Sequence, residues 1–221
     1  MFPRCWFGLL LVILALPQFA QSDDRVALVI GNAKYEGNPL RNPVNDAAAM
    51  ETSLKNLNFK VTKKTDINLA QMEDAIVQFK RSLKKESIAL FFYAGHGLEV
   101  KGDNYLMPLD AKFQEEFQVK EKCYKLDQVL TALDDSKAAL KIVILDCCRD
   151  NPFTRSWRRG DKGNGLAAVA NIPDGTIIAF STAPGKTALD SALGSSLNSP
   201  YTKQLVASLN QRPKDGLEVI A

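Results

Sequence analysis

The stretch ALKIVILDCCRDNPF, residues 139–153, decides how the rest of the chain is interpreted. Its first part is a short apolar run rich in β-branched residues, which predicts a buried strand. The run ends in Asp146, two adjacent cysteines and Arg149, and a turn follows. Polar residues at the carboxyl end of a parallel strand lie where ligands bind. Three interpretations are open at this point: a cysteine peptidase, a thiol redox protein, or a structural domain with a well-packed strand.

The same kind of apolar run recurs along the chain, alternating with amphipathic segments. Strands are expected over 25–31, 59–64, 87–97, 139–148 and 175–182, and helices over 43–57, 68–85, 126–135 and 200–209. The strand over 87–97 is expected to stop at a Gly-His-Gly turn, and 99–109 reads as a hairpin. This alternation predicts an α/β fold with a mostly parallel central sheet and helices on both faces.

Length and composition indicate one globular domain: the chain has 221 residues, of which 46% are hydrophobic and 24% charged. Its formal net charge of +3 is too small to indicate a nucleic acid or a membrane surface as partner.

Residues 1–22 have one basic residue, an apolar stretch and small residues before an acidic pair. This pattern predicts a signal peptide and a protein that is periplasmic or secreted, with no membrane attachment after cleavage. The alternative is an uncleaved anchor, although the apolar stretch is short for a membrane span.

The strand expected over 87–97 ends in Ala94-Gly95-His96-Gly97, and His96 is the only histidine of the chain. A lone histidine is more often a satisfied core or surface residue than a catalyst. Flanking glycines at the end of a buried strand allow a sharp turn and a close approach of substrate, which favours a functional role. A cysteine acts as the thiolate, and a neighbouring histidine can take its proton. The ends of neighbouring strands would bring His96 near the cysteines at 147 and 148.

Six segments resemble a known family: RVALVIGNAKY (25–35), LRNPVNDA (40–47), FFYAGHG (91–97), NYLMPLDA (104–111), ILDCCRDNPF (144–153) and AFSTAPG (179–185). In this order they resemble caspase-clan cysteine peptidases of the bacterial metacaspase/paracaspase-like (orthocaspase) type. In caspases too, the histidine lies about 50 residues before the cysteine. The resemblance implies a caspase-hemoglobinase fold and a catalytic dyad of His96 and Cys148. It also implies an oxyanion hole formed by the main-chain N–H groups of Gly97 and Cys148.

The adjacent cysteines are given different roles. Side chains alternate along a strand, so Asp146 and Cys148 are expected on one face and Cys147 on the other. The family pattern places the nucleophile at Cys148 and a small residue at the position of Cys147, which is interpreted as a small buried hydrophobe. A vicinal redox pair is disfavoured because the Cys-x-x-Cys spacing is absent. Cys123 is interpreted as structural or incidental.

Two acids match the S1 pocket of metacaspase-like relatives, which binds Arg or Lys at P1. They are Asp146 and Asp46, although on the residues alone Asp46 reads as a solvated acid in the first turn of a helix. The resemblance therefore implies an endopeptidase that cleaves protein or peptide substrates after Arg or Lys. Further candidates for lining the cleft are Ala94, Ser181, Thr182 and Asp190.

The resemblance also divides residues 23–221 into a large part up to about 150, a linker loop 151–174 and a small part 175–221. Candidate self-cleavage sites in the linker are Arg155, Arg158 and Arg159, and the alternative is a basic surface loop. Relatives usually continue beyond the last helix, so a truncated domain is expected.

No metal or cofactor is expected to be required. Calcium activates some relatives, but the sequence shows no dense carboxylate loop. The oligomeric state stays open. The rival function is a catalytically inactive caspase-like domain used for binding or as a scaffold, and retention of both His96 and Cys148 favours the enzyme.

Overall fold

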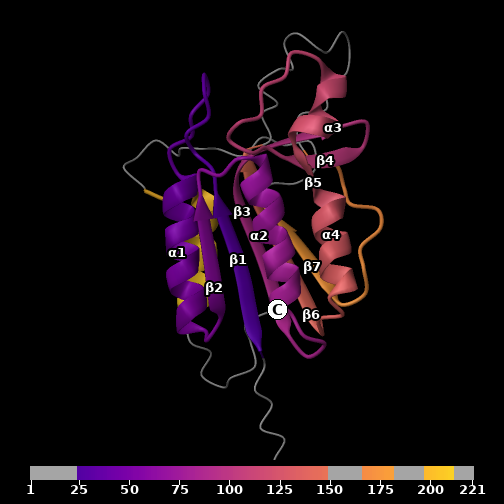
Figure 1. Cartoon of the computed structure of the whole chain (residues 1–221). Helices are drawn as coiled ribbons and strands as arrows, with labels where there is room; N and C mark the ends of the chain where they lie inside the picture. Colours follow the sequence, from indigo (N-terminus) through magenta and orange to yellow (C-terminus); the bar gives the residue numbers. More distant parts are fainter. Residues whose placement is uncertain (1–23, 149–165, 182–196, 212–221) are drawn as a thin grey trace, which may run out of the picture.

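A parallel sheet forms the centre of the protein (Figure 1). The computed structural model describes residues 24–148, 166–181 and 197–211. Across the sheet the parallel strands follow the order β2 (Lys60–Thr65), β1 (Arg25–Gly31), β3 (Ile88–Val100), β6 (Leu140–Cys148) and β7 (Thr176–Phe180). The predicted α/β fold with a mostly parallel sheet is confirmed.

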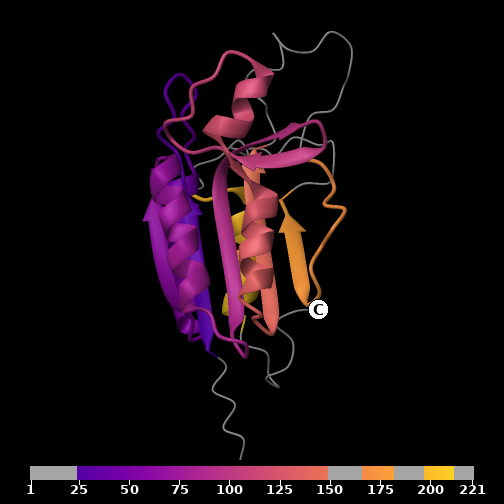
Figure 2. The same ribbon diagram turned by 45° about the vertical axis from the view of Figure 1, so that its right-hand side comes forward.

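Helices cover both faces of this sheet. The first face carries α1 (Pro43–Asn56) and α6 (Pro200–Asn210), and the second carries α2 (Leu69–Ser82) and α4 (Leu126–Asp135). Figure 2, turned from the view of Figure 1, shows α6 in yellow behind the sheet and α4 in front of it. Within the described residues, none of the helices has the length and apolar character needed to cross a membrane.

Successive side chains of a strand point to opposite faces of the sheet, which explains why the core has two layers. In β6, Val143 and Leu145 belong to the apolar cluster beneath α2 and α4, whereas Ile144 belongs to the cluster beneath α1 and α6. Both clusters are closely packed, and side chains in the middle of β1 and β3 are fully buried. Strands buried on both faces read as continuous apolar runs, which is why the sequence predicted them well.

One prediction about β3 was wrong: the strand does not stop at the Gly-His-Gly segment. It continues through His96 and Gly97 to Val100 and then pairs antiparallel with β4 (Asp103–Leu106). The glycines serve close packing inside the strand, because a Cβ at Gly97 would lie 3.1 Å from the Cβ of Cys147. The hairpin predicted over 99–109 is confirmed, with its turn at Lys101 and Gly102.

Beyond β4 the chain builds a small unit above the carboxyl end of the sheet (Figure 1). It contains η1 (Glu116–Gln118), α3 (Val119–Lys122) and β5 (Tyr124–Lys125), and β5 pairs antiparallel with β4. These elements are too short to give a periodic apolar pattern and were not predicted. Of these elements, η1 contributes Gln118 to the lining of a cavity that His96 also lines.

Candidate active site

The pairing of β3 with β6 brings the candidate dyad together. In the parallel register, Ala94 lies opposite Asp146, Gly95 opposite Cys147 and His96 opposite Cys148. Neighbouring strands are about 5 Å apart, so the main chains of His96 and Cys148 are adjacent although 52 positions separate 96 from 148. The expected meeting of these two strand ends is therefore what the structure shows.

The imidazole of His96 is buried, with 2% of the residue exposed, and its orientation is defined by a main-chain group. Its Nε2 lies 2.8 Å from the carbonyl oxygen of Asn38. A carbonyl oxygen only accepts hydrogen bonds, so Nε2 carries the hydrogen and Nδ1 is the nitrogen that can take a proton. No sequence pattern indicates this contact, because any residue at position 38 offers the same carbonyl.

The loop after β1 that supplies this carbonyl is itself anchored by polar contacts, of which those of Asn32 are buried. The Oδ1 of Asp66 accepts from the main-chain N–H of Ala33 at 2.8 Å and of Lys34 at 3.1 Å. The side chain of Asn32 accepts from the N–H of Ile67 at 3.0 Å and donates to its carbonyl oxygen at 3.2 Å. These contacts explain why an otherwise irregular Gly- and Asn-containing loop keeps a defined position beside His96.

The two candidate S1 acids lie together against the start of α6. Ser199 joins them, because its N–H donates to Oδ1 of Asp46 at 2.9 Å and its hydroxyl donates to Oδ2 of Asp146. Asn198 also donates to Asp46, at 2.9 Å, and the hydroxyl of Thr202 donates to Asp146 at 2.6 Å. Both acids are buried, with 1% of Asp46 and 8% of Asp146 exposed. Asp46 is therefore not the solvated helix acid that the residues alone would indicate.

Sequence reasoning missed the three donors that hold these acids. A local signal existed for Ser199, since a serine followed by proline is typical of a helix start, and its hydroxyl accepts from the N–H of Thr202 at 2.9 Å. The second role of this hydroxyl, donation to Asp146, is a contact across 53 positions. Local patterns carry no information about such a partner.

Cys147 and Cys123 both lie in the interior. Cys147 is 1% exposed and packs in the cluster beneath α2 and α4, on the face opposite to Asp146. Strand alternation predicted these opposite faces correctly. Cys123 is 4% exposed, and burial raises the pKa of its thiol far above the ordinary value. Thiols that are shielded from solvent react slowly, so neither residue has the environment of a nucleophile.

We expect iodoacetamide to modify Cys123 and Cys147 at least about 100-fold more slowly in the folded protein than after unfolding in guanidinium, because only exposed thiolates react quickly. Peptide mapping by mass spectrometry before and after denaturation measures both rates within one sample. Equal modification of Cys147 in the two states would contradict its structural role.

The remaining predicted residues are only partly covered by the structure. Ala94 is buried next to Asp146 on the neighbouring strand. Ser181 follows β7, and its N–H donates to the carbonyl of Leu145 at 3.0 Å, which places it beside the end of β6. Five predicted residues lie outside the described residues: Thr182 and Asp190 in the cleft, and Arg155, Arg158 and Arg159 in the linker.

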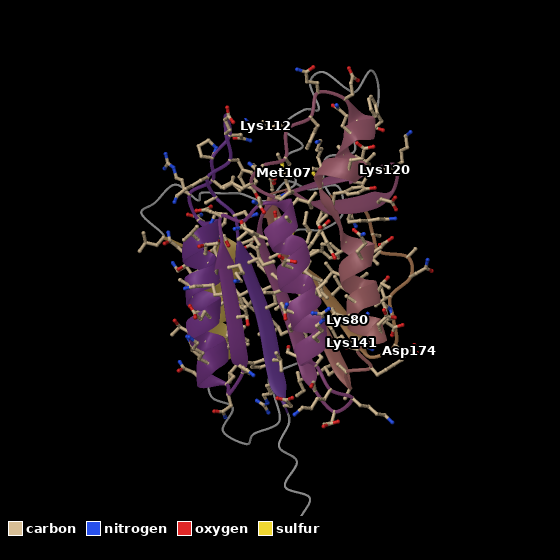
Figure 3. All side chains as sticks on the ribbon, in the orientation of Figure 1. Lys80, Met107, Lys112, Lys120, Lys141 and Asp174 are labelled. Atoms are coloured by element: carbon tan, nitrogen blue, oxygen red, sulfur yellow. The ribbon has the colours of Figure 1, made fainter. Side chains whose placement is uncertain are left out.

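A cavity of about 850 Å³ opens beside His96. The loop 35–38 lines one side of it, and residues of the segment 107–118 line the other. Lys112 and Glu36 form an exposed ion pair at 2.5 Å across its rim. Figure 3 shows Met107 and Lys112 at the carboxyl end of the sheet, far from Lys141 and Asp174 at the opposite end. In the part of the chain that the structure describes, no cluster of three or more His, Cys, Asp or Glu residues is arranged to hold a metal ion.

The mostly parallel sheet with helices on both faces is that of a caspase-type domain, and the main chains of His96 and Cys148 are adjacent on two of its strands. A family model described as the caspase domain matches residues 24–220, so the chain belongs to this family, whose members form a class of cysteine peptidases. The resemblance seen in the sequence is thereby confirmed.

Two curated relatives are similar to part of the chain. They are the human mucosa-associated lymphoid tissue lymphoma translocation protein 1 and its mouse homologue, each 33% identical over 127 residues. The match covers 57% of this chain and 15% of each relative, so it concerns one segment of much longer proteins.

Proposed function

We propose that the protein is a cysteine endopeptidase that uses His96 and Cys148 to cleave peptide bonds after Arg or Lys. The observation that carries this proposal is the register of β3 and β6, which sets His96 opposite Cys148 on the strand that also carries Asp146, whose carboxylate Ser199 joins to that of Asp46. Membership of the caspase-domain family supports the reaction class, and the two acids support the specificity.

In the proposed reaction, Nδ1 of His96 takes the proton of the Cys148 thiol, and the thiolate attacks the carbonyl carbon of the scissile bond. The N–H groups of Gly97 and Cys148 stabilise the oxyanion of the tetrahedral intermediate. His96 then protonates the leaving amine, and a thioester remains on Cys148. Water, deprotonated by His96, attacks the thioester and releases the acid product and the thiol. Throughout, the Asn38 carbonyl accepts from Nε2 and stabilises the charged imidazolium.

The specificity follows from the charge of the pocket. The donors on Asp46 and Asp146 from the start of α6 are neutral groups, so these hydrogen bonds add no positive charge to the pocket. Both hydrogen bonds to Asp146 use Oδ2, and the described residues give its Oδ1 none. A guanidinium or ammonium group at P1 would bind the carboxylate oxygens of Asp46 and Asp146 through charge-assisted hydrogen bonds.

Fluorogenic peptides ending in Arg, Lys or Asp test the proposal, with and without calcium. Wild type should cleave after Arg or Lys, and Cys148→Ala should lose this activity by about 10⁴-fold or more, because the nucleophile is gone. Cys147→Ala is the matched control and should retain activity. Cleavage after Asp would contradict the assignment of the two acids. Absence of cleavage under every condition would contradict the enzyme and favour the binding or scaffold function.

We also propose that the protein is exported, and that it acts on protein substrates in the periplasm or outside the cell without a required cofactor. The linker loop 151–174, with its three arginines, would then be a site of self-cleavage. Gels of purified wild type and Cys148→Ala check this: a cut within the loop is expected in wild type only. Equal fragmentation of both proteins would contradict self-cleavage.

A further inference from the structure

We propose that Tyr35 and Tyr93 are positioning residues for His96. Their hydroxyl groups hold the main chain of His96 at both of its polar groups, and the ring of Tyr35 fixes the imidazole. This role rests on the proposed function, in which His96 transfers protons to and from Cys148 and substrate.

The main chain of His96 is bonded to a tyrosine on each side. Its N–H donates to the hydroxyl oxygen of Tyr35 at 3.1 Å. Its carbonyl oxygen accepts from the hydroxyl of Tyr93 at 2.8 Å, and also from the N–H of Met107 at 3.0 Å. A strand residue usually bonds to neighbouring strands through main-chain groups alone, whereas here two side chains from β3 and the loop after β1 take part.

The hydrogens of the two hydroxyls are fully used. The hydroxyl oxygens of Tyr35 and Tyr93 lie 3.1 Å apart, and each group has one hydrogen to donate. The carbonyl oxygen of Met107 lies 3.0 Å from the hydroxyl of Tyr35 and 2.9 Å from that of Tyr93, and the carbonyl oxygen of His96 lies 2.8 Å from the hydroxyl of Tyr93. Both carbonyls are served when Tyr35 donates to Met107 and Tyr93 donates to His96. The network thus links the end of β3 to the segment after β4, which begins at Met107.

The imidazole is held as well as the main chain. The ring centroids of Tyr35 and His96 are 4.5 Å apart with a tilt of 52°, which is a favourable aromatic contact. Asn38, three positions after Tyr35 in the same loop, supplies the carbonyl that accepts from Nε2. One loop therefore contacts the face of the ring, its edge and the main chain behind it.

Both tyrosines are buried, with 4% of Tyr35 and 0% of Tyr93 exposed. Burial raises the pKa of each phenol well above its ordinary value, so both phenols stay protonated and able to donate at neutral pH. The tyrosines therefore add no ionisation of their own to the pH profile. Catalysis needs reacting groups held within about 0.5 Å of the productive geometry, and this buried network restrains both the main chain and the ring of His96.

Phenylalanine substitutions remove the hydroxyls and keep the rings. Tyr35→Phe and Tyr93→Phe should each lower kcat for a P1-arginine peptide by about tenfold or more, with KM within about twofold, because they misplace His96 and leave the S1 acids intact. Tyr105→Phe is the control, since Tyr105 is also buried and belongs to the same apolar cluster as Tyr35. It should retain the wild-type kcat. Unchanged kcat in both test variants would overturn the proposal.

A second readout does not depend on catalysis. Because His96 is the only histidine of the chain, ¹⁵N-histidine labelling gives imidazole signals that belong to it alone. Wild type and Tyr105→Phe should show one sharp set of imidazole signals with the hydrogen on Nε2, where the Asn38 carbonyl accepts it. Tyr35→Phe should show shifted or broadened signals, because the hydroxyl that holds the His96 main chain is gone. Identical spectra in all of them would also overturn the proposal. If no variant cleaves any peptide but the spectra differ as expected, the proposed function fails while the positioning of His96 stands.

Discussion

Asp146→Asn is expected to lower kcat/KM for a P1-arginine peptide by about 100-fold or more while the protein stays folded. A buried charge pair truncated on one side typically loses 2–5 kcal/mol, and about 1.4 kcal/mol corresponds to tenfold. The amide has nearly the shape of the carboxylate, and its oxygen can still accept from Ser199 and Thr202. The substitution therefore removes charge from the pocket and leaves the contact with α6 largely in place.

Asp146→Ala separates the loss of activity caused by the missing charge from a loss of stability. It leaves the hydroxyls of Ser199 and Thr202 without their acceptor, and each buried unsatisfied group costs about 1–3 kcal/mol. Urea unfolding should therefore show a clearly lower free energy of unfolding for Asp146→Ala than for Asp146→Asn. Asp135→Asn, which changes an acid of α4 in an exposed ion pair with Lys80, is the control and should leave cleavage unchanged. Wild-type cleavage by Asp146→Asn would contradict a role of Asp146 in S1.

The sequence predicted the sheet and its helices because continuous apolar runs and helical periodicity are local features. The same logic placed His96 next to Cys148, since both follow apolar runs that form neighbouring strands. It failed where tertiary contacts override a local signal. The glycines at 95 and 97 indicate a turn when read locally, but the strand continues through them, and a Cβ would lie only 2.7 Å from two hydroxyl oxygens at position 95 and 3.1 Å from the Cβ of Cys147 at position 97.

Much of the candidate site depends on groups that leave no trace in the sequence. The Asn38 carbonyl belongs to the main chain, which every residue has. The acids at 46 and 146 were indicated by resemblance, but the hydroxyl of Ser199 that joins Asp146 to α6 was not. Tyr35 reads as an ordinary loop residue until its hydroxyl is seen 3.1 Å from the N–H of His96.

The second large effect is expected from Gly95→Ala, which should lower the free energy of unfolding by about 3 kcal/mol and activity by about 100-fold or more. A Cβ at Gly95 would lie 2.7 Å from the hydroxyl oxygens of both Tyr35 and Tyr93, and 2.9 Å from Cζ of Tyr93. The two rings are buried, so they can move only by shifting their neighbours. Any such shift also displaces His96, which is bonded to both hydroxyls. Urea unfolding and peptide hydrolysis measure the two effects.

Gly102→Ala is the matched control, because Gly102 also has a positive φ, at +88°, but a Cβ there would meet nothing within 4 Å. Gly102→Ala should lower the free energy of unfolding only by the backbone strain, about 1 kcal/mol, and should leave activity intact. A double-mutant cycle then tests the cause. In a Tyr35→Phe/Tyr93→Phe background both clashing hydroxyls are absent, so Gly95→Ala should destabilise the protein less than it does in wild type. Equal costs in the two backgrounds would mean that the hydroxyls are not what excludes a side chain at position 95.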